Sequence, residues 1–351
     1  MEYLDISQLV RSDYDRLVAV EPGDNGRAQL FRRLEDGRVE TIECDFHPWL
    51  LVVGEELAQT LTGTSEIVSL EGGGTHRVRV SFPNVAAYEA GIKQLKDLTG
   101  YNPSSPQAPY RVFSDLTQQL LTMLPARLFR GMNFGDLRRM QLDIETRTSG
   151  NHRFPDALRP DDAVIMVALK DSTGWEEALV LNQDGEAALL RKMIQLVQER
   201  DPDVIEGHNI FNFDLDYLEK RCRRHRIKLA LGRGGQIVKA RTSRFTAAER
   251  TATYRRYDIY GRHVMDTYHL VQLYDVSSRD MDSYGLKAAA IHFGVAAPER
   301  TYIEGSEISR VFEEDRERLQ EYCLDDVRET DALAKILSPS YFYQAQLIPY
   351  S

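Results

Sequence analysis

Cysteine is scarce in this 351-residue sequence: Cys44, Cys222 and Cys323 lie far apart and form no Cys-x-x-Cys pair. This pattern argues against structural zinc and for a reducing compartment, so we expect a cytoplasmic protein. No apolar run approaches the about 20 residues that cross a bilayer, and the N-terminus lacks the basic and then apolar layout of a signal peptide. We therefore expect no membrane partner.

Positive charge is outnumbered overall, with 44 Lys and Arg against 54 Asp and Glu and a formal net charge of −10. It is concentrated in residues 220–262, where 14 Lys and Arg face only Glu249 and Asp258, a local charge of +12 against −22 for the rest of the chain. Such segregation favours a cationic surface for a polyanion beside an acidic site. The alternative is an ordinary solvated helix face and loop.

The first hundred residues predict a small α+β domain, residues 1–104. Short alternating strands are expected between residues 17 and 82, with a hairpin turn at Asp36-Gly37. A helix is expected to start at Asn84, which is a good N-cap residue. The Pro- and Ser-rich stretch 101–109 is typical of a linker, and the short helix expected at 114–124 follows it.

From about residue 137 the pattern changes to an alternation of strands and helices, which predicts a mixed sheet flanked by helices over residues 105–351. Strands are expected at 137–145, 163–169, 178–181, 203–207 and 262–268. Helices are expected at 185–200, from about 213, and at 283–293, 308–319 and 316–337.

Two carboxylates share one face of the first of these strands. Asp143 and Glu145 alternate with Leu142 and Ile144, so they project together just before a polar loop. Adjacent carboxylates repel each other unless a cation lies between them. Alone, this pattern also fits a solvent-facing pair at a sheet edge.

Two further segments carry acidic residues in suggestive surroundings. In "EGHNIFNFDLDYL" (206–218), a short buried strand and a turn with Asn209 lead into a helix with Asp214 in its first turn, where a carboxylate is favourable. In "LQEYCLDDVRETDAL" (319–333), Tyr322 and Asp326 are four residues apart on a helix and share a face, whereas Asp325 does not have this relation to Tyr322.

The conjunction of the three segments is more specific than any one of them. Asp143, Glu145, Asp214 and Asp326 would provide four oxygen ligands without His or Cys, which suits two Mg²⁺ or Mn²⁺ ions. Two such ions can stabilise both oxygens of an in-line phosphoryl displacement. Tyr322 could orient the attacking water or help to deprotonate it.

These segments resemble the three exonuclease motifs of DEDDy 3′–5′ exonucleases, which have an RNase H-like fold. More narrowly, residues 105–351 resemble the exonuclease region of family B DNA polymerases, through "LFRGMNFGDLRRMQLDIET", "DPDVIEGHNIFNFDLDYL", "GRHVMDTYHLV" and "SYGLKAAA". The first hundred residues resemble the family only by position.

The resemblance implies a role for each matching residue. Asp143, Glu145, Asp214 and Asp326 would hold the metal ions, and Tyr322 would position the water. Asn209 and Phe213 would shape the pocket for the terminal nucleotide. Residues 239–262 would form a β-hairpin that helps to part the primer from the template. Apart from the resemblance, the basic charge of segment 220–262 predicts that Arg255 and Arg256 bind DNA phosphates.

The sequence departs from the family in lacking the D-x-x-S-L-Y-P and Y-G-D-T-D motifs of the polymerase palm. We therefore expect no polymerisation by this chain, which would be part of a longer polymerase or a shortened or split relative. The expected function is proofreading at single-stranded or frayed 3′ ends of DNA, with the missing polymerase domain or a separate polymerase subunit as partner. An RNA-trimming exonuclease of the same superfamily and a non-catalytic DNA-binding accessory module are the alternatives.

Overall fold

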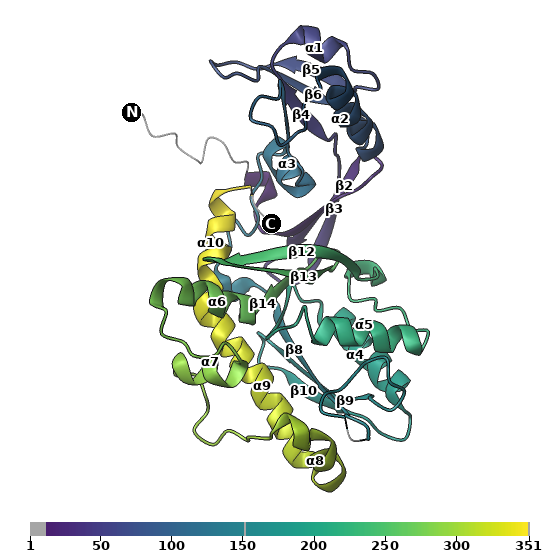
Figure 1. Cartoon of the computed structure of the whole chain (residues 1–351), viewed down its shortest axis with the longest axis vertical. Coiled ribbons are helices and arrows are strands. Elements are labelled where there is room, and N and C mark those ends of the chain that lie inside the picture. The colour runs from purple at the N-terminus through teal and green to yellow at the C-terminus, as the bar shows by residue number, and fades with distance from the viewer. Residues whose placement is uncertain (1–11, 151, 350–351) are drawn as a thin grey trace. The chain divides into compact units, whose positions relative to one another are not determined.

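The computed structural model describes residues 12–150 and 152–349 (Figure 1). The chain divides into two compact units: the second comprises Asn133–Tyr341, and the first contains the described residues up to Met132 with those from Phe342 on. Within the described residues, no helix combines the length and the apolar character that crossing a membrane requires.

The first unit, which we call the N-terminal unit, contains two antiparallel sheets, in the orders β1-β2-β3 and β5-β6-β4-β7. Asn84 caps α2 by accepting a hydrogen bond from the backbone N–H of Ala87 at 2.8 Å, as its sequence position predicts. Its elements are β1 (Leu17–Pro22), β2 (Arg27–Arg33), β3 (Val39–Asp45), β4 (Trp49–Val52), α1 (Glu55–Gln59), β5 (Glu66–Ser69), β6 (Val78–Ser81), α2 (Val85–Thr99), β7 (Tyr110–Val112) and α3 (Leu116–Met123).

The N-terminal unit extends past residue 104, where the sequence places the domain boundary. The reason is β7, which pairs with β4 and so continues the sheet beyond the Pro- and Ser-rich stretch. Tyr110 of β7 is fully buried in the same apolar cluster as Leu50 and Val80. A short strand directly after a linker-like composition is not visible in the local pattern.

The second unit follows the predicted order of strands and helices, with boundaries that differ by a few residues. Its elements are β8 (Arg139–Thr146), β9 (Val164–Asp171), β10 (Glu176–Val180), α4 (Glu186–Arg200), β11 (Val204–Gly207), α5 (Asp214–Arg224), β12 (Lys239–Ala247), β13 (Arg250–Asp258), β14 (His263–Asp266), α6 (Thr267–Ser278), α7 (Leu286–His292), α8 (Ile308–Glu314) and α9 (Arg316–Leu337). The last helix, α10 (Pro339–Leu347), begins in this unit and belongs to the first unit from Phe342 on.

These strands form a mixed sheet in the order β10-β9-β8-β11-β14. β9 is antiparallel to both β8 and β10, whereas β11 is parallel to β8 and to β14. The helices flank this sheet, and the β-rich unit precedes it, which confirms the predicted fold class. Because β8, β11 and β14 are parallel, their carboxyl ends lie at one edge of the sheet.

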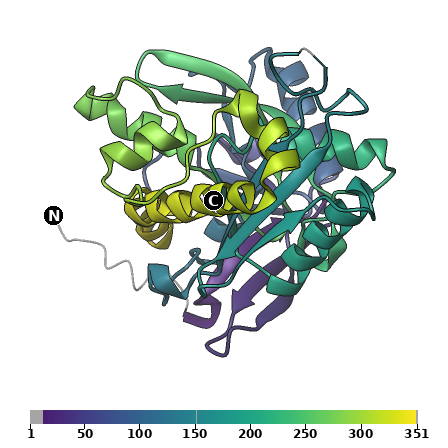
Figure 2. The ribbon, with the colours of Figure 1, turned by 90° about the horizontal axis from the view of Figure 1, so that it is seen from below.

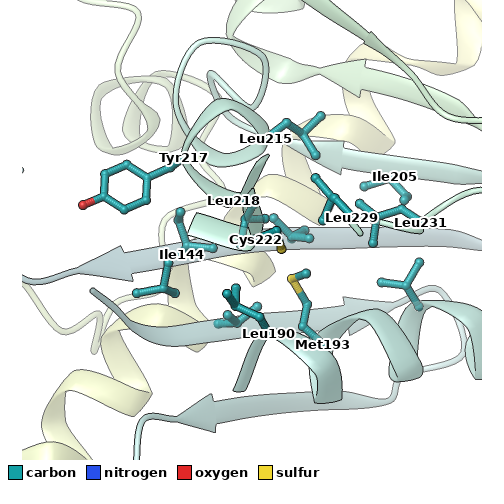
Figure 3. Close-up of a cluster of buried hydrophobic side chains, with 14 of the residues drawn as sticks. Ile144, Leu190, Met193, Ile205, Leu215, Tyr217, Leu218, Cys222, Leu229 and Leu231 are labelled. Atoms are coloured by element: carbon teal, nitrogen blue, oxygen red, sulfur yellow. The ribbon is translucent and has the colours of Figure 1, made fainter. Parts of the chain in front are cut away.

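The alternation along β8 separates an apolar face from a polar one. Ile144 is buried in the cluster under α4 and α5 (Figure 3), and Met140 and Leu142 belong to the same cluster. Asp143 and Glu145 alternate with them and therefore project to the opposite face. That face is covered by α9, which packs on β8 and β9 and crosses the strands in Figure 2 as the yellow helix.

The sequence did not predict one helix of the second unit, α6. A strand was expected to run to residue 268, but β14 ends at Asp266, whose side chain caps α6 by accepting a hydrogen bond from the N–H of Tyr268 at 3.0 Å. The stretch "TYHLVQLYDV" is rich in β-branched and aromatic residues, which locally favour a strand, and tertiary packing of Leu270 and Val271 overrides that preference.

Candidate functional site

The candidate site lies where β8, the start of α5 and the middle of α9 meet. The backbone N–H of Ile144 donates to Asp214 Oδ1 at 3.2 Å, which joins β8 to α5. The thiol of Cys323 on α9 donates weakly to Asp143 Oδ2 at 3.7 Å, which joins α9 to β8. Potential ligand atoms of Asp143, Glu145 and Cys323 all lie within 4.8 Å of one another. Three segments far apart in sequence therefore converge on one spot.

The turn after β11 brings Asp214 to this edge of the sheet. β11 ends at Gly207, where a Cβ would lie 2.8 Å from Ile210 Cβ, so the tight turn requires glycine. Asn209 follows with a positive φ of 65°, a conformation that asparagine tolerates well. The carbonyl of Asn209 accepts hydrogen bonds from the N–H of Asn212 at 3.1 Å and of Phe213 at 3.0 Å. This compact turn directs the chain into α5, whose first residue is Asp214.

Asp143, Glu145, Asp214 and Asp326, which we call the carboxylate cluster, influence one another strongly. Burial raises the pKa of Asp143 well above its usual range, and the charges of Asp326, Asp214 and Glu145 raise it further. Burial, Asp326 and Asp214 likewise raise the pKa of Glu145. For Asp214, the rise in pKa comes from burial and from the charges of Asp266 and Asp326, against hydrogen bonds from the backbone. The cluster therefore concentrates negative charge that a cation would stabilise.

The sequence analysis assigned no role to two cationic side chains that adjoin the cluster. Arg300, in the loop after α7, is buried and pairs with Asp326 and with Glu329. Lys287 on α7 lies 4.8 Å from the ring centroid of Tyr322, donates to the carbonyl of Ile303 at 3.1 Å, and lowers the pKa of Glu145 and of Asp326. Neither follows a periodic pattern, although Lys287 lies in the segment "SYGLKAAA" that resembles the family.

The two neighbouring aspartates of α9 face different partners. Asp326 belongs to the carboxylate cluster. Asp325 Oδ2 instead accepts a hydrogen bond from the N–H of Thr301 at 3.1 Å, and its Oδ1 pairs with Arg328 at 3.0 Å. Only Asp326 was expected to share a helix face with Tyr322, and the two aspartates do make different contacts. Asp325 binds the loop that contains Thr301.

Tyr322 is buried on α9, one helical turn before Asp326. Burial and the charges of Asp326, Glu145 and Asp143 raise the pKa of its hydroxyl far above the usual value. In the metal-free protein the hydroxyl is therefore protonated at neutral pH, and it can donate a hydrogen bond to a water or to a phosphate oxygen.

The donor set of the cluster fits a hard divalent cation. All four carboxylates offer oxygen, which Mg²⁺ and Mn²⁺ prefer. Cys323 is the soft donor in the neighbourhood, but burial and the charges of Asp143 and Glu145 raise its thiol pKa well above the usual value. In the metal-free protein the thiol thus remains protonated and donates its weak hydrogen bond to Asp143.

Asn209 and Phe213, predicted to contact a terminal nucleotide, lie in the turn that leads to Asp214, and both are partly exposed. The buried Asp266 at the end of β14 supports this turn, because its carboxylate accepts a hydrogen bond from the N–H of Asn209 at 2.7 Å. Burial raises the pKa of Asp266 to about 6. Sequence analysis missed Asp266, although an acidic residue before Thr-Tyr at a strand end is a recognisable N-cap signal.

The basic segment 220–262 is less exposed than its composition indicates. Arg221 pairs with Glu186 at 2.6 Å, Arg233 with Asp203 at 2.6 Å and Arg262 with Asp201 at 2.7 Å, and all three arginines are buried. Buried arginine is expected to be paired in this way. Part of the local charge of +12 therefore stabilises the fold and is not available to a polyanion.

The rest of the segment includes an antiparallel hairpin, β12–β13, within the predicted range 239–262. The ring of Phe245 on this hairpin stacks on His269 of α6, with centroids 4.0 Å apart and an interplanar angle of 9°. Arg255 pairs with Glu219 of α5 at 2.7 Å, and Arg256 pairs with Asp258 at 3.0 Å. Both arginine side chains remain partly exposed, so both can still reach a phosphate.

The hairpin arginines provide a test of nucleic-acid binding. We expect the double variant Arg255→Ala, Arg256→Ala to bind single-stranded DNA more weakly and to reduce the slope of log affinity against log salt by about 1 to 1.5, because two phosphate contacts are lost. The measurement is fluorescence anisotropy over a salt series. The matched control is Arg310→Ala, which removes an exposed arginine paired with Glu307 and Glu314 on α8. An unchanged slope in the double variant would show that these arginines belong to an ordinary solvated surface and do not bind DNA.

Comparison with known proteins adds an independent line of argument. Residues 172–289 match the family described as DNA polymerase family B, exonuclease domain. DNA polymerase 2 of Aeropyrum pernix is 29% identical over 206 residues, which cover 58% of this chain and 23% of that protein. The DNA polymerase of Thermococcus kodakarensis is 26% identical over 226 residues, which cover 62% of this chain and 12% of that protein. The matched part thus spans about a quarter or less of these relatives.

A solved structure extends the likeness of the fold to nearly the whole chain. The family B DNA polymerase of Pyrobaculum calidifontis superposes with a TM-score of 0.69 at 21% identity, over 96% of this chain and 48% of that one. The family match at 172–289 includes Asn209, Asp214 and the hairpin. Asp143 and Glu145 lie before it, and Arg300, Tyr322 and Asp326 lie after it, so the geometry of the fold is what unites them.

Proposed function

This chain carries an exonuclease domain of DNA polymerase family B, and we propose that it hydrolyses the terminal phosphodiester at the 3′ end of single-stranded or frayed DNA. The observation that supports this proposal best is the meeting of β8, α5 and α9: possible ligand atoms of Asp143, Glu145 and Cys323 lie within 4.8 Å of one another, and Asp214 accepts a hydrogen bond from the backbone of β8. The proposed biological role is proofreading, with a polymerase domain or subunit as the partner that presents the DNA end.

The carboxylate cluster would hold two divalent ions, Mg²⁺ or Mn²⁺, through Asp143, Glu145, Asp214 and Asp326. Such ions, when bound, stabilise the charge on the attacking and leaving oxygens of an in-line displacement. The protein's own contribution is to fix these carboxylates on a strand and two helices, so that little reorganisation is needed at the moment of reaction.

Tyr322 would orient the attacking water or the scissile phosphate by donating its hydroxyl hydrogen. Asn209 and Phe213 would contact the terminal nucleotide, because their turn leads directly into Asp214. The hairpin β12–β13 would help to part the primer from the template, with Arg255 and Arg256 contacting phosphates. These residues all belong to the second unit.

The test is a nuclease assay on 5′-labelled single-stranded DNA with Mg²⁺ or Mn²⁺. We expect a descending ladder of products, resistance of a 3′-blocked strand, loss of activity in excess chelator and recovery with Mn²⁺. The double variant Asp143→Ala, Glu145→Ala is the control for contaminating nucleases. Internal cleavage of circular single-stranded DNA, or activity that persists in chelator, would contradict the proposal.

The same assay separates the alternatives. An RNA strand of the same sequence tests the RNA-trimming reading, which predicts faster degradation of RNA than of DNA. DNA binding without cleavage under any metal condition would favour a non-catalytic accessory module.

A further inference from the structure

Arg300 has an unusual position for an arginine beside a metal site. It lies in the loop between α7 and η5 (Gly305–Glu307), and its side chain is 0% exposed. The loop is tied to α9 at two consecutive residues, through Thr301 N–H to Asp325 and through the Arg300 guanidinium to Asp326. A permanently charged group is therefore held against one of the four carboxylates of the cluster.

Glu329 is a second partner of this guanidinium. It lies three residues after Asp326 on α9, so both side chains project from the same face of the helix. It is buried and forms an ion pair with Arg300 Nη1. Nη2 of the same guanidinium donates to Asp326, so Arg300 bridges the two buried carboxylates.

The Arg300 guanidinium and a divalent metal ion would compete for the same carboxylate, Asp326. While the guanidinium holds Asp326 Oδ1, that oxygen is not free for a divalent ion. A buried carboxylate is costly without a charged partner, and Glu329 already contacts the guanidinium, so Glu329 can keep Arg300 when Asp326 takes up a metal ion. Arginine has five N–H donors in a planar fork and can exchange one carboxylate for another with a small movement.

We propose that Arg300 is a resident counter-ion of the metal site, which neutralises Asp326 in the metal-free protein and is held by Glu329 alone when a divalent ion takes Asp326. The proposal rests on the function proposed above for Asp326 as a metal ligand. Glu329 then keeps the guanidinium and is a positioning residue, not a catalytic one. The intrinsic affinity of the carboxylate cluster for metal is lowered by Arg300 and raised by Glu329.

These opposite roles predict opposite effects of two neighbouring substitutions on Mn²⁺ binding in the absence of DNA. Arg300→Gln removes the competing positive charge, so the Kd for Mn²⁺ should fall by about tenfold or more. Glu329→Gln removes the second carboxylate and leaves Arg300 on Asp326, so the Kd should rise by about tenfold. A purely structural role of the pair would weaken binding in both variants.

The experiment is titration of the full chain with Mn²⁺, with free ion followed by electron paramagnetic resonance and heat followed by calorimetry. Arg310→Gln is the matched control, since it removes an exposed arginine that also pairs with two glutamates, and its Kd should equal that of the wild type. Thermal unfolding in chelator and in Mn²⁺ provides a second measure: Mn²⁺ should raise the unfolding midpoint most in Arg300→Gln and least in Glu329→Gln.

Shifts of the two Kd values in opposite directions support the proposal. Equal values for wild type and both variants, or shifts in the same direction, overturn it. If Arg300→Gln does not fold, the isosteric Glu329→Gln decides alone, since a weaker Kd supports the proposal and an unchanged Kd overturns it. If the wild type itself does not bind Mn²⁺, the proposed metal site is wrong, and this result is distinct from binding that the variants do not alter.

Discussion

Asp143→Asn is expected to slow cleavage of a 3′ end by at least about 10²–10³-fold, the cost typical of losing one preorganised electrostatic contact, while it stabilises the metal-free fold. The gain in stability follows from the raised pKa of Asp143, which is caused by burial and by three neighbouring carboxylates. Replacing the carboxylate by an amide of the same shape removes that repulsion. In a unit of this size, each kcal/mol gained raises the unfolding midpoint by about 2–4 °C.

The measurement pairs single-turnover cleavage with thermal unfolding in chelator. Asp162→Asn is the matched control, because Asp162 is also buried, yet its carboxylate accepts hydrogen bonds from the N–H of Ser149 and Asp156 and from Arg159, each at 2.8 Å. Although burial opposes it, these hydrogen bonds lower the pKa of Asp162 to about 2. Asp162→Asn should therefore destabilise the fold and leave the chemistry intact. An Asp143→Asn protein that melts earlier than the wild type in chelator would contradict the electrostatic account.

The same electrostatics give the pH dependence of stability a definite sign. The pKa values of Asp143, Glu145 and Asp214 are higher in the folded than in the unfolded chain. Their protonation therefore favours the fold below the ordinary carboxylate pKa of about 4, and this contribution is lost as pH rises through the folded pKa values. The asparagine variant and the Mn²⁺-bound protein should show a weaker loss over this range.

The second large effect separates Tyr322 from the carboxylates. Tyr322→Phe keeps the ring and its packing but removes the hydroxyl, so cleavage should slow by about 10²–10⁴-fold while Mn²⁺ and DNA affinity stay near those of the wild type. Asp326→Ala should lose metal affinity together with activity. Single-turnover rates and Mn²⁺ titrations of the two variants provide the comparison.

Asp325→Ala is the informative neighbour in this series. Asp325 holds the N–H of Thr301 and pairs with Arg328, so its loss should loosen the loop that carries Arg300 and reduce stability. The metal affinity should change less than in Asp326→Ala. An inactive Asp325→Ala beside an active Asp326→Ala would show that the assignment of the third segment is wrong by one residue.

Local periodicity was sufficient to predict much of this fold and the components of its site. The alternation in 139–146 and the four-residue spacing of Tyr322 and Asp326 put each side chain on a definite face of its element. The pairing of β8 with β9 and β11 was not predicted and comes from the structure. The role of these carboxylates in catalysis remains a prediction, whereas their proximity is a property of the fold.

What sequence patterns could not give are contacts made by loops and by buried charges. Arg300 reaches Asp326 from a loop without any repeat, and Glu329 is one acidic residue among many on α9. Arg221 and Arg233 looked like part of a cationic surface, because composition does not reveal that Glu186 and Asp203 lie beside them in the core. Charge pairing over long sequence separations depends on the tertiary structure alone.

The two faces of β8 have a consequence for how this gene can change over time. Because side chains alternate, gain or loss of a single codon within Arg139–Thr146 would exchange the faces beyond that point, sending carboxylates into the layer under α4 and α5 and methyl groups toward α9. The fold and the reactive groups would be lost in one event. Evolution can therefore substitute residues along this strand one at a time, whereas an insertion or deletion of one residue breaks the two-residue alternation of its side chains.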